Sequence, residues 1–427
     1  YNDSLVKIGD VTLTYHEFLL QMGLIEIKED KSNIITLGVI AKQEKVKDSS
    51  VINSTIGMLY DEEGNLFTFD SVNKTINNLT ADEKFEYSST PAHAKFHEAV
   101  KRWVFQDNYD EMTSVFHVEV MATPGGSGAL SNTFSNYLNP GEKALLPSVM
   151  WGNYKQFLYE SGSSYDCYKL FNDNNEFNIE HLKEMVYKHK EEQNRVLLVI
   201  NDPCHNPTGY CMKDHEWDQV IDLLNEVSSE GCNVILMLDM AYIDYDLRGL
   251  ENSRNTIMKF RRFNDNILTI LGFSGSKTMA LYGLRIGAMI GLSKNEQDIK
   301  DFAVANKFSS RAKWSNSSML GINIITKIIL DDELRNSFKE ELEAARVTLI
   351  SRAKAFIEEA DKVGLKYLPF DCGFFITIPC DDPDAVYKRL VEKKVHLIPM
   401  GNIIRATLSS ISLDECKRLP KIIKECL

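Results

Sequence analysis

The stretch that decides the fold reads GFSGSKTMALYGLRIGAMIG and covers residues 272–291. Its single lysine, Lys277, follows a run of serine and glycine, and Arg285 comes eight residues later between two further glycines. Small residues let a backbone approach a bound group closely, and an arginine among them can hold a phosphate bidentately. A lysine whose pKa is lowered by burial or nearby cations can form a Schiff base with an aldehyde. The stretch predicts a site for pyridoxal phosphate, which carries both groups; the alternative is a surface lysine beside a salt-bridging arginine.

Composition narrows the class of protein. The chain has 427 residues, a length typical of about two or three domains, and a net charge of −13 with dispersed lysines and arginines. A nucleic-acid partner is therefore not expected, and local arginines must hold any anionic ligand. No apolar run approaches the roughly 20 residues of a membrane span, and no signal peptide is recognised. We expect a cytoplasmic protein without a membrane partner.

The cysteines predict neither a disulfide framework nor a metal site. All eight lie between residues 167 and 426 and include no CxxC pair, which is typical of reduced thiols. No group of cysteine and histidine has zinc-ligand spacing, and no HExxH occurs. We therefore expect no bound metal.

Apolar strands alternate with helical segments from about residue 85 to 310. This alternation is typical of an α/β fold whose central sheet is mostly parallel and flanked by helices. The strands are expected at 118–123, 143–147, 196–201, 234–240, 267–273 and 288–292. After a long helical region at 320–360, short strands at 373–380 and 396–400 predict a second, smaller α+β domain.

Polar residues follow several of these strands, at the edge where parallel sheets bind ligands. Gly126 and Ser127 open a helix directly after a strand, a geometry that binds anions, and the missing third glycine favours one phosphate over a pyrophosphate. Asn206 lies in a loop that two prolines make rigid. Asp239 lies inside the apolar strand expected at 234–240, with Tyr242 three residues on, and a buried carboxylate needs a cation or hydrogen-bond donor.

Two further residues each have two interpretations. Trp151, near a strand end, can stack on a flat ring or belong to the core. Gly57 can present a bare backbone amide to a ligand or serve only a turn. The sequence pattern alone leaves both pairs open.

The order of these motifs resembles class I pyridoxal-phosphate-dependent aminotransferases of fold type I, in the aspartate and aromatic aminotransferase branch. The resemblance covers about residues 85 to 410. It is carried by TPGGSGAL (123–130), Trp151 with Asn153, CHNPTG (204–209), DMAY (239–242), SGSK (274–277) with Arg285, RAKWSN (311–316) and Arg405.

The resemblance implies a role for each cofactor-binding residue. Lys277 would hold the cofactor's aldehyde and later move a proton, with Asp239 paired to the ring nitrogen. Asn206 and Tyr242 would hydrogen-bond the ring oxygen, and Trp151 would stack on the ring. The residues expected to hold the phosphate are Gly126, Ser127, Ser274 and Arg285, together with Tyr87 reaching across from a neighbouring subunit.

The resemblance also implies the substrates and the assembly. Arg405 would bind the substrate α-carboxylate, and Arg311 would cross from the partner subunit to bind a distal carboxylate. Gly57 and Asn206 would also line the substrate site. The expected partners are an amino acid, a 2-oxo acid and a second copy of the chain in a homodimer. The large domain would span residues 70–320, and the small domain would combine 1–69 with 321–427.

The expected reaction is transamination between aspartate and a 2-oxo acid such as 2-oxoglutarate. An aromatic amino acid as donor is the first alternative, and a lyase or decarboxylase on the same scaffold is the second. Two departures from the family pattern concern Tyr87, which Ser88 and Ser89 follow where many relatives have glycine, and residues 1–50, which match nothing recognisable.

Overall fold

The computed structural model describes residues 5–8, 11–14 and 34–427. Residues 1–4, 9–10 and 15–33, which belong to the expected small domain, lie outside the described residues. Two strands near the N-terminus, β1 (Leu5–Ile8) and β2 (Val11–Thr14), pair antiparallel in a sheet of their own. Among the helices described, none combines the length and the apolar run that a bilayer crossing needs.

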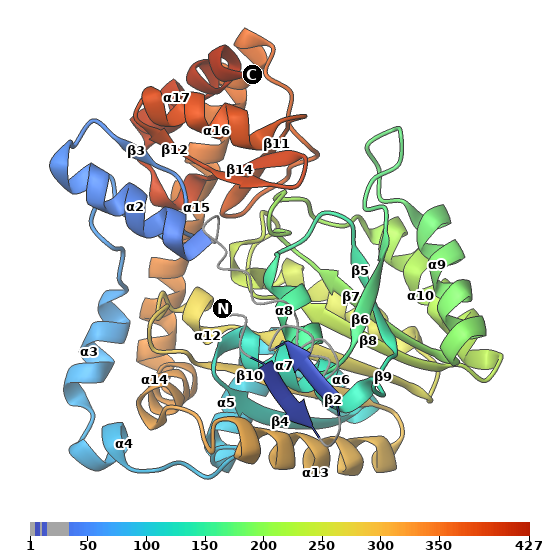
Figure 1. Ribbon diagram of the computed structural model, residues 1–427. Helices are drawn as coiled ribbons and strands as arrows, with labels where there is room; N and C mark the ends of the chain where they lie inside the picture. The colour runs from blue at the N-terminus through green and yellow to red at the C-terminus, as the bar shows by residue number, and fades with distance from the viewer. Residues whose placement is uncertain (1–4, 9–10, 15–33) are drawn as a thin grey trace.

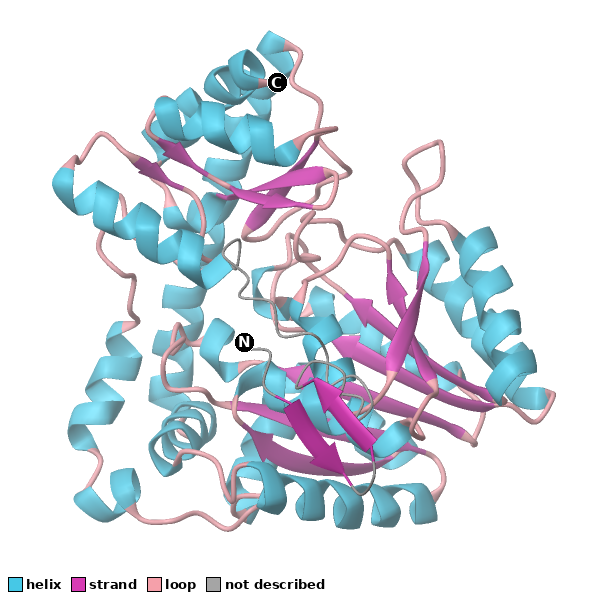
Figure 2. Cartoon of the chain, viewed as in Figure 1, coloured by secondary structure: helices cyan, strands magenta, loops and turns pink. Residues whose placement is uncertain are grey.

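A seven-stranded sheet forms the centre of the larger body (Figures 1 and 2). Six of the seven strands run in the same direction and β10 runs in the opposite one, so the expected mostly parallel α/β sheet is confirmed. The carboxyl ends of the other six strands therefore meet at one edge. In spatial order the strands are β4 (His117–Thr123), β10 (Gly287–Ser293), β9 (Ile267–Phe273), β8 (Asn233–Asp239), β7 (Arg195–Asn201), β5 (Lys143–Pro147) and β6 (Ser164–Tyr168).

Helices cover both faces of this sheet, which explains why its central strands are apolar throughout. Side chains of β8 alternate between the two sides: Ile235 and Met237 join one core, whereas Leu236 and Leu238 join the other. The first core includes α7 (Gly125–Tyr137), α8 (Asn153–Glu160) and α13 (Glu296–Lys313). The second includes α5 (Ala94–Phe105), α9 (Ile179–Gln193), α10 (Asp214–Ser229) and α14 (Met319–Leu330).

A smaller lobe lies above this body in Figure 1 and has its own hydrophobic core. Its antiparallel sheet has the order β11 (Phe375–Pro379), β14 (Ile403–Thr407), β13 (Ile398–Met400). The helices α16 (Pro383–Glu392) and α17 (Leu413–Cys426) pack on it. β3 (Ile52–Asn53) follows α2 (Ile34–Lys47) and pairs parallel with β12 (Val395–His396), so both ends of the chain contribute to this lobe.

The long helix α15 (Asp332–Val363) connects the two cores. Phe338 and Leu342 in its first half pack in the core of the large body, and Phe356 in its second half packs in the core of the lobe. The division into residues 70–320 and 1–69 with 321–427 remains a proposal. This packing favours a C-terminal boundary inside α15 and not at residue 320.

Candidate active site

Lys277 lies at the carboxyl edge of the central sheet. β9 ends at Phe273, and Ser274 caps the short helix α12 (Gly275–Thr278) by accepting a hydrogen bond from the Lys277 amide at 3.3 Å. This turn directs the lysine towards the small lobe, where its Nζ donates to the Gly57 carbonyl oxygen at 2.7 Å. The Tyr242 ring centre lies 5.6 Å from the same nitrogen.

The ammonium form of Lys277 is disfavoured in this position. Burial, followed by the charges of Arg285 and Arg405, lowers the pKa of Lys277 from 10.5 to about 7, and the charge of Asp239 opposes this shift. A substantial fraction of the amine is therefore unprotonated, and hence nucleophilic, near neutral pH.

Asp239, the last residue of β8, presents a buried carboxylate to the site. One oxygen accepts a hydrogen bond from the Tyr154 hydroxyl at 2.6 Å, and the other accepts from the Ala241 amide at 3.3 Å. Burial raises the pKa of Asp239, whereas the Tyr154 hydrogen bond lowers it. No lysine or arginine among the described residues forms a salt bridge with this carboxylate. It can therefore receive a protonated nitrogen from a ligand.

A phosphate-sized cradle forms where α7 begins. The Arg285 Nη2 atom lies 3.5 Å from the Ser127 hydroxyl oxygen and so faces the first turn of that helix. A Cβ placed on Gly125 would lie only 2.8 Å from Arg285 Nη2, and one on Gly126 would lie 3.9 Å from the Ser274 Cβ. The guanidinium, the serine hydroxyls and the free amides of α7 thus converge, as anion sites at helix N-termini require.

Arg405 is a buried cation without a carboxylate partner among the described residues. It is 2% exposed, and its Nη2 and Nη1 atoms donate to the Thr55 carbonyl oxygen at 2.5 Å and to the Asn206 Oδ1 atom at 3.4 Å. Its Nε atom has no hydrogen-bond partner within the described part of the chain. The guanidinium lies over the Phe375 ring at 4.3 Å, and burial lowers the pKa of Arg405 to about 10.

The remaining expected residues differ in how close they lie to this group. Trp151 is half-buried, and its ring packs edge-on against that of Tyr154, with centroids 5.7 Å apart. Asn206 directs its side-chain oxygen to Arg405. Tyr87 is 87% exposed, and Arg311 is exposed near the end of α13, where it hydrogen-bonds Ser315. No contact within the described part of the chain brings these last two residues to Lys277.

The structure adds residues that the sequence reasoning did not identify. Tyr154 is the donor to Asp239, and Tyr282 places its ring centre 5.0 Å from Lys277 Nζ while accepting a hydrogen bond from the Leu59 amide. Phe375 supports Arg405. Tyr154 lies three residues after Trp151 and Tyr282 lies inside the 272–291 stretch, so proximity to a recognised motif was the available signal.

These groups fit pyridoxal phosphate. Lys277, Arg285 and Arg405 form no salt bridge with any described carboxylate, and Asp239 forms none with any described lysine or arginine. An aldehyde, a phosphate and a protonated ring nitrogen match the amine, the cradle and the carboxylate, respectively. The fold and the site thus define the class of the protein, a pyridoxal-phosphate-dependent enzyme of fold type I.

Comparison with known proteins identifies the family. The sequence model of the aminotransferase class I and II family matches residues 49–423, and the chain belongs to this family. Its reaction is pyridoxal-phosphate-dependent transamination.

Relatives and solved structures agree with this assignment. The mitochondrial aspartate aminotransferase of Dictyostelium discoideum is 22% identical, with 88% of each chain covered. The aromatic-amino-acid aminotransferase of Pseudomonas aeruginosa is 25% identical, over 71% of this chain and 74% of that one. An aminotransferase from Anaerococcus prevotii superposes with a TM-score of 0.88 at 26% identity, covering 94% and 99% of the two chains. An aromatic-amino-acid aminotransferase from Burkholderia pseudomallei, covalently bound to pyridoxal phosphate, gives a TM-score of 0.78 at 20% identity, with 94% and 98% covered.

Proposed function

We propose that this aminotransferase takes its amino group from a dicarboxylic amino acid, aspartate or glutamate, and transfers it to a 2-oxo acid. The observation that carries the binding of an amino acid is Arg405, a buried guanidinium that lacks a carboxylate partner among the described residues and retains an unpartnered Nε atom. The choice of a dicarboxylic donor rests on the role proposed below for Arg311. A buried, unpaired cation is costly, and a substrate α-carboxylate in bidentate contact would offset that cost.

The cofactor-binding roles follow from the same reasoning. Pyridoxal phosphate, when bound, supplies an aldehyde that exchanges amines and a ring that withdraws electrons. Arg285, with the backbone of Gly126 and the hydroxyls of Ser127 and Ser274, holds the phosphate. Asp239 keeps the ring nitrogen protonated, and Tyr154 holds that carboxylate in place through its 2.6 Å hydrogen bond.

Lys277 has two roles that use the same nitrogen. Because its pKa is lowered to about 7, the amine is available to bind the aldehyde. Once a substrate amine replaces it, the free Nζ atom can move a proton between the substrate Cα and the C4′ atom of the cofactor. Trp151 would stack on the ring, and Asn206 and Tyr242 would hydrogen-bond its oxygen. Asn206 also accepts the 3.4 Å hydrogen bond from Arg405.

We also propose a homodimer located in the cytoplasm. Val304 and Phe308 are 71% and 77% exposed on one face of α13, and Tyr87 is 87% exposed. Val304 and Phe308 lie one helical turn apart and form a small apolar patch, and exposed apolar patches mark protein–protein contacts. A second copy seated there would cover this patch, and the partner subunit's Arg311 and the partner subunit's Tyr87 would reach the site. The location stays open to test because relatives include both cytoplasmic and mitochondrial proteins.

Substrate preference tests this proposal. We would measure kcat/KM for aspartate, glutamate, tyrosine and phenylalanine in the wild type, in Arg311→Ala and in Lys307→Ala, a control for an exposed cation on the same helix. Arg311→Ala should lose roughly 2–5 kcal/mol of transition-state binding for aspartate and glutamate, as for a broken buried charge pair. Tyrosine and phenylalanine lack the distal charge and should lose much less.

Two results would contradict the proposal. An equal loss for all four amino acids would assign Arg311 to the fold or the interface and not to specificity. Release of ammonia or carbon dioxide in place of an oxo acid would favour a lyase or a decarboxylase.

A further inference from the structure

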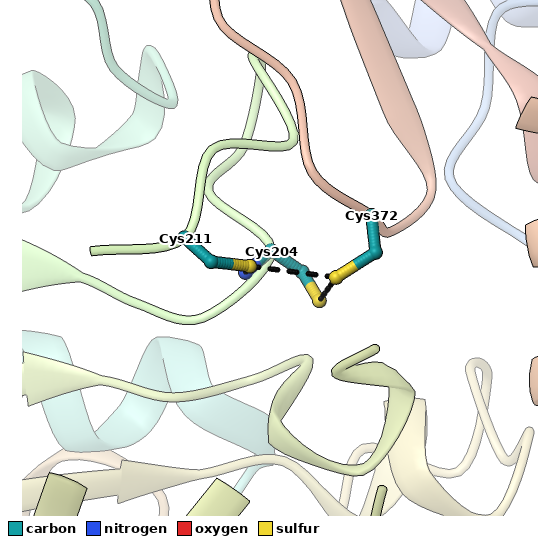
Figure 3. A group of neighbouring side chains, drawn as sticks. All are labelled: Cys204, Cys211 and Cys372. Carbon is teal, nitrogen blue, oxygen red and sulfur yellow. Dashed lines mark hydrogen bonds between the residues drawn. The ribbon is translucent and has the colours of Figure 1, made fainter. Parts of the chain in front are cut away.

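Three buried cysteines from distant parts of the chain meet where the loop after β7 contacts the segment before β11 (Figure 3). The Sγ atom of Cys372 lies 3.5 Å from that of Cys204 and 3.4 Å from that of Cys211. All three sulfur atoms lie within 4.8 Å of one another. No metal site is expected from the sequence, because no group of cysteine and histidine has zinc-ligand spacing. Cys372 is 161 residues from Cys211, so the fold alone brings these thiols together.

Backbone amides donate hydrogen bonds to two of these sulfurs. The Cys204 amide donates to Cys211 Sγ at 3.3 Å, and the Leu247 amide donates to Cys372 Sγ at 3.2 Å. Such donors stabilise the anionic form of sulfur and are the outer-shell contacts that metal–thiolate sites use. Buried anions require a cation, and no lysine or arginine among the described residues bonds to these sulfurs.

The backbone conformation around the cysteines allows their close approach. Gly373 has a φ of 116°, and a Cβ there would lie 2.7 Å from the Cys204 Cβ, so only glycine fits. The amides of Asp371 and Cys372 donate to the Gly209 carbonyl oxygen at 2.9 and 3.1 Å. The Cys211 amide donates to the Asp371 carboxylate at 2.8 Å. These bonds hold the three sulfurs together without relying on a bound ion.

We propose that Cys204, Cys211 and Cys372 bind one zinc ion, or a similar thiophilic ion, through three thiolates. A tetrahedral zinc with bonds of about 2.3 Å places its sulfur ligands about 3.8 Å apart, a spacing that the triangle of sulfurs reaches with small movements. The thiols release their protons as the metal–sulfur bonds form. No fourth cysteine, histidine or carboxylate joins the group within the described chain, so the proposed protein ligands number three.

The ion would connect the loop after β7 to the segment before β11, beside the active site. Cys204 lies two residues before Asn206, and Cys372 lies three residues before Phe375, whose ring supports the Arg405 guanidinium. A bound ion therefore fixes the loop and the strand that position the substrate-binding arginine. This role is structural and does not depend on which amino acid is the donor.

Metal binding by the purified holoenzyme tests the proposal. After removal of metals with a chelator, the protein is dialysed to equilibrium against zinc, and the bound zinc is measured by mass spectrometry. Wild type and Cys167→Ser, a control in β6 outside the group, should each bind one zinc per chain. Cys204→Ser and Cys372→Ser should bind more than about 100-fold more weakly.

Two further measurements keep the test valid if a variant fails to fold. Cadmium added to the wild type should give an ultraviolet thiolate-to-metal band, of which Cys211→Ser keeps about two thirds because one of three metal–sulfur bonds is lost. Zinc should also protect these three cysteines, and not Cys167, from alkylation in the wild type. Absence of stoichiometric zinc, a cadmium band independent of these cysteines, or a disulfide-linked peptide joining Cys372 to Cys204 or Cys211 would each overturn the proposal.

Discussion

Lys277 lies among cations and aromatic rings, and no salt bridge to a carboxylate is formed in the described structure. Arg285 and Arg405 both disfavour its charge, and the rings of Tyr242 and Tyr282 lie 5.6 and 5.0 Å from its nitrogen. Asp239 opposes the shift, but burial and the two arginines outweigh it. Lys277 therefore destabilises the fold at pH values below its ordinary pKa of 10.5, and this cost can be measured.

Replacing Lys277 with methionine should stabilise the cofactor-free protein most at acidic pH. The pKa of Lys277 falls from 10.5 to about 7 on folding, so between these values the unfolded chain binds more protons and wild-type stability rises with pH. Below about pH 7 the folded state bears the full cost, and above about 10.5 the cost is absent. The Tm advantage of Lys277→Met over the wild type should therefore shrink as pH rises through this window.

Thermal unfolding across the same window supplies the check. Lys307→Met replaces an exposed lysine and should show a Tm difference that hardly varies with pH. A Tm difference for Lys277→Met that is equally flat would mean that the amine keeps its ordinary pKa in the folded protein.

The charged residues of the candidate site can be predicted from the sequence, whereas the contacts between them cannot. An apolar strand that contains Asp239 predicts that this carboxylate needs a partner, because its burial is costly. That Tyr154 donates to it depends on how α8 packs on β8, which no local pattern encodes. For Arg311 and Tyr87 the sequence predicts roles that involve a second subunit. Both side chains are exposed in the single chain, so these roles stay predictions.

At the scale of elements, the site depends on how β9, α12 and β10 close against the start of α7. Gly287 begins β10, and a Cβ placed on it would lie 2.5 Å from the Phe273 carbonyl oxygen and 2.7 Å from the Gly125 carbonyl carbon. Both neighbours are backbone atoms and cannot rotate away. The end of β9, which precedes Lys277, and the start of α7, which faces Arg285, therefore both contact Gly287.

Gly287→Ala should consequently destabilise the protein and disturb the phosphate cradle. We expect a loss of roughly 1–3 kcal/mol in the free energy of unfolding, the cost typical of overpacking, together with weaker binding of pyridoxal phosphate. Gly283→Ala is the matched control, since no atom lies within 4 Å of the Cβ it would add. Denaturant unfolding and cofactor titration would measure both effects. Equal stability of the two variants would refute the close contact.

Strands whose two faces are both buried could be predicted from their apolar sequences. Apolar runs identified β4, β5, β7, β8, β9 and β10 to within about a residue at each end. β6 was missed because its sequence, SYDCY, is polar and mostly half-buried at the sheet edge. The reversed direction of β10 was not predicted either; its connection contains only the four-residue α12, too short a helix for a crossover.

At the scale of the whole molecule, the active site belongs to neither core alone. Arg405 lies on β14 of the small lobe, and Gly57 lies between Ile52 of the lobe core and Leu59 of the large-body core. Lys277, Asp239 and Arg285 come from the large body. The small lobe and the large body must therefore be correctly placed for Lys277, Arg285 and Arg405 to face one ligand. The exposed patch on α13 extends this dependence to a second copy of the chain.

Phe308→Asp should convert the proposed homodimer into monomers. Phe308 is 77% exposed in one chain, so the aspartate costs the folded monomer little, whereas a charge buried in an interface is expensive. Analytical ultracentrifugation should give a dimer for the wild type and for Val46→Asp, a control on α2 that is 82% exposed. Activity should fall with the dimer because the partner subunit's Arg311 is lost. A wild type that sediments as a monomer would remove the proposed role of Arg311.

The central claim is that Lys277 is the amine that holds the cofactor. Its most direct test is borohydride reduction of the purified protein loaded with pyridoxal phosphate, followed by peptide mapping with mass spectrometry. We expect the phosphopyridoxyl group on Lys277 in the wild type and no labelled peptide in Lys277→Ala, although this variant should remain folded. A label on any other lysine, or a Lys277→Ala protein that still transaminates at more than a trace rate, would contradict the claim.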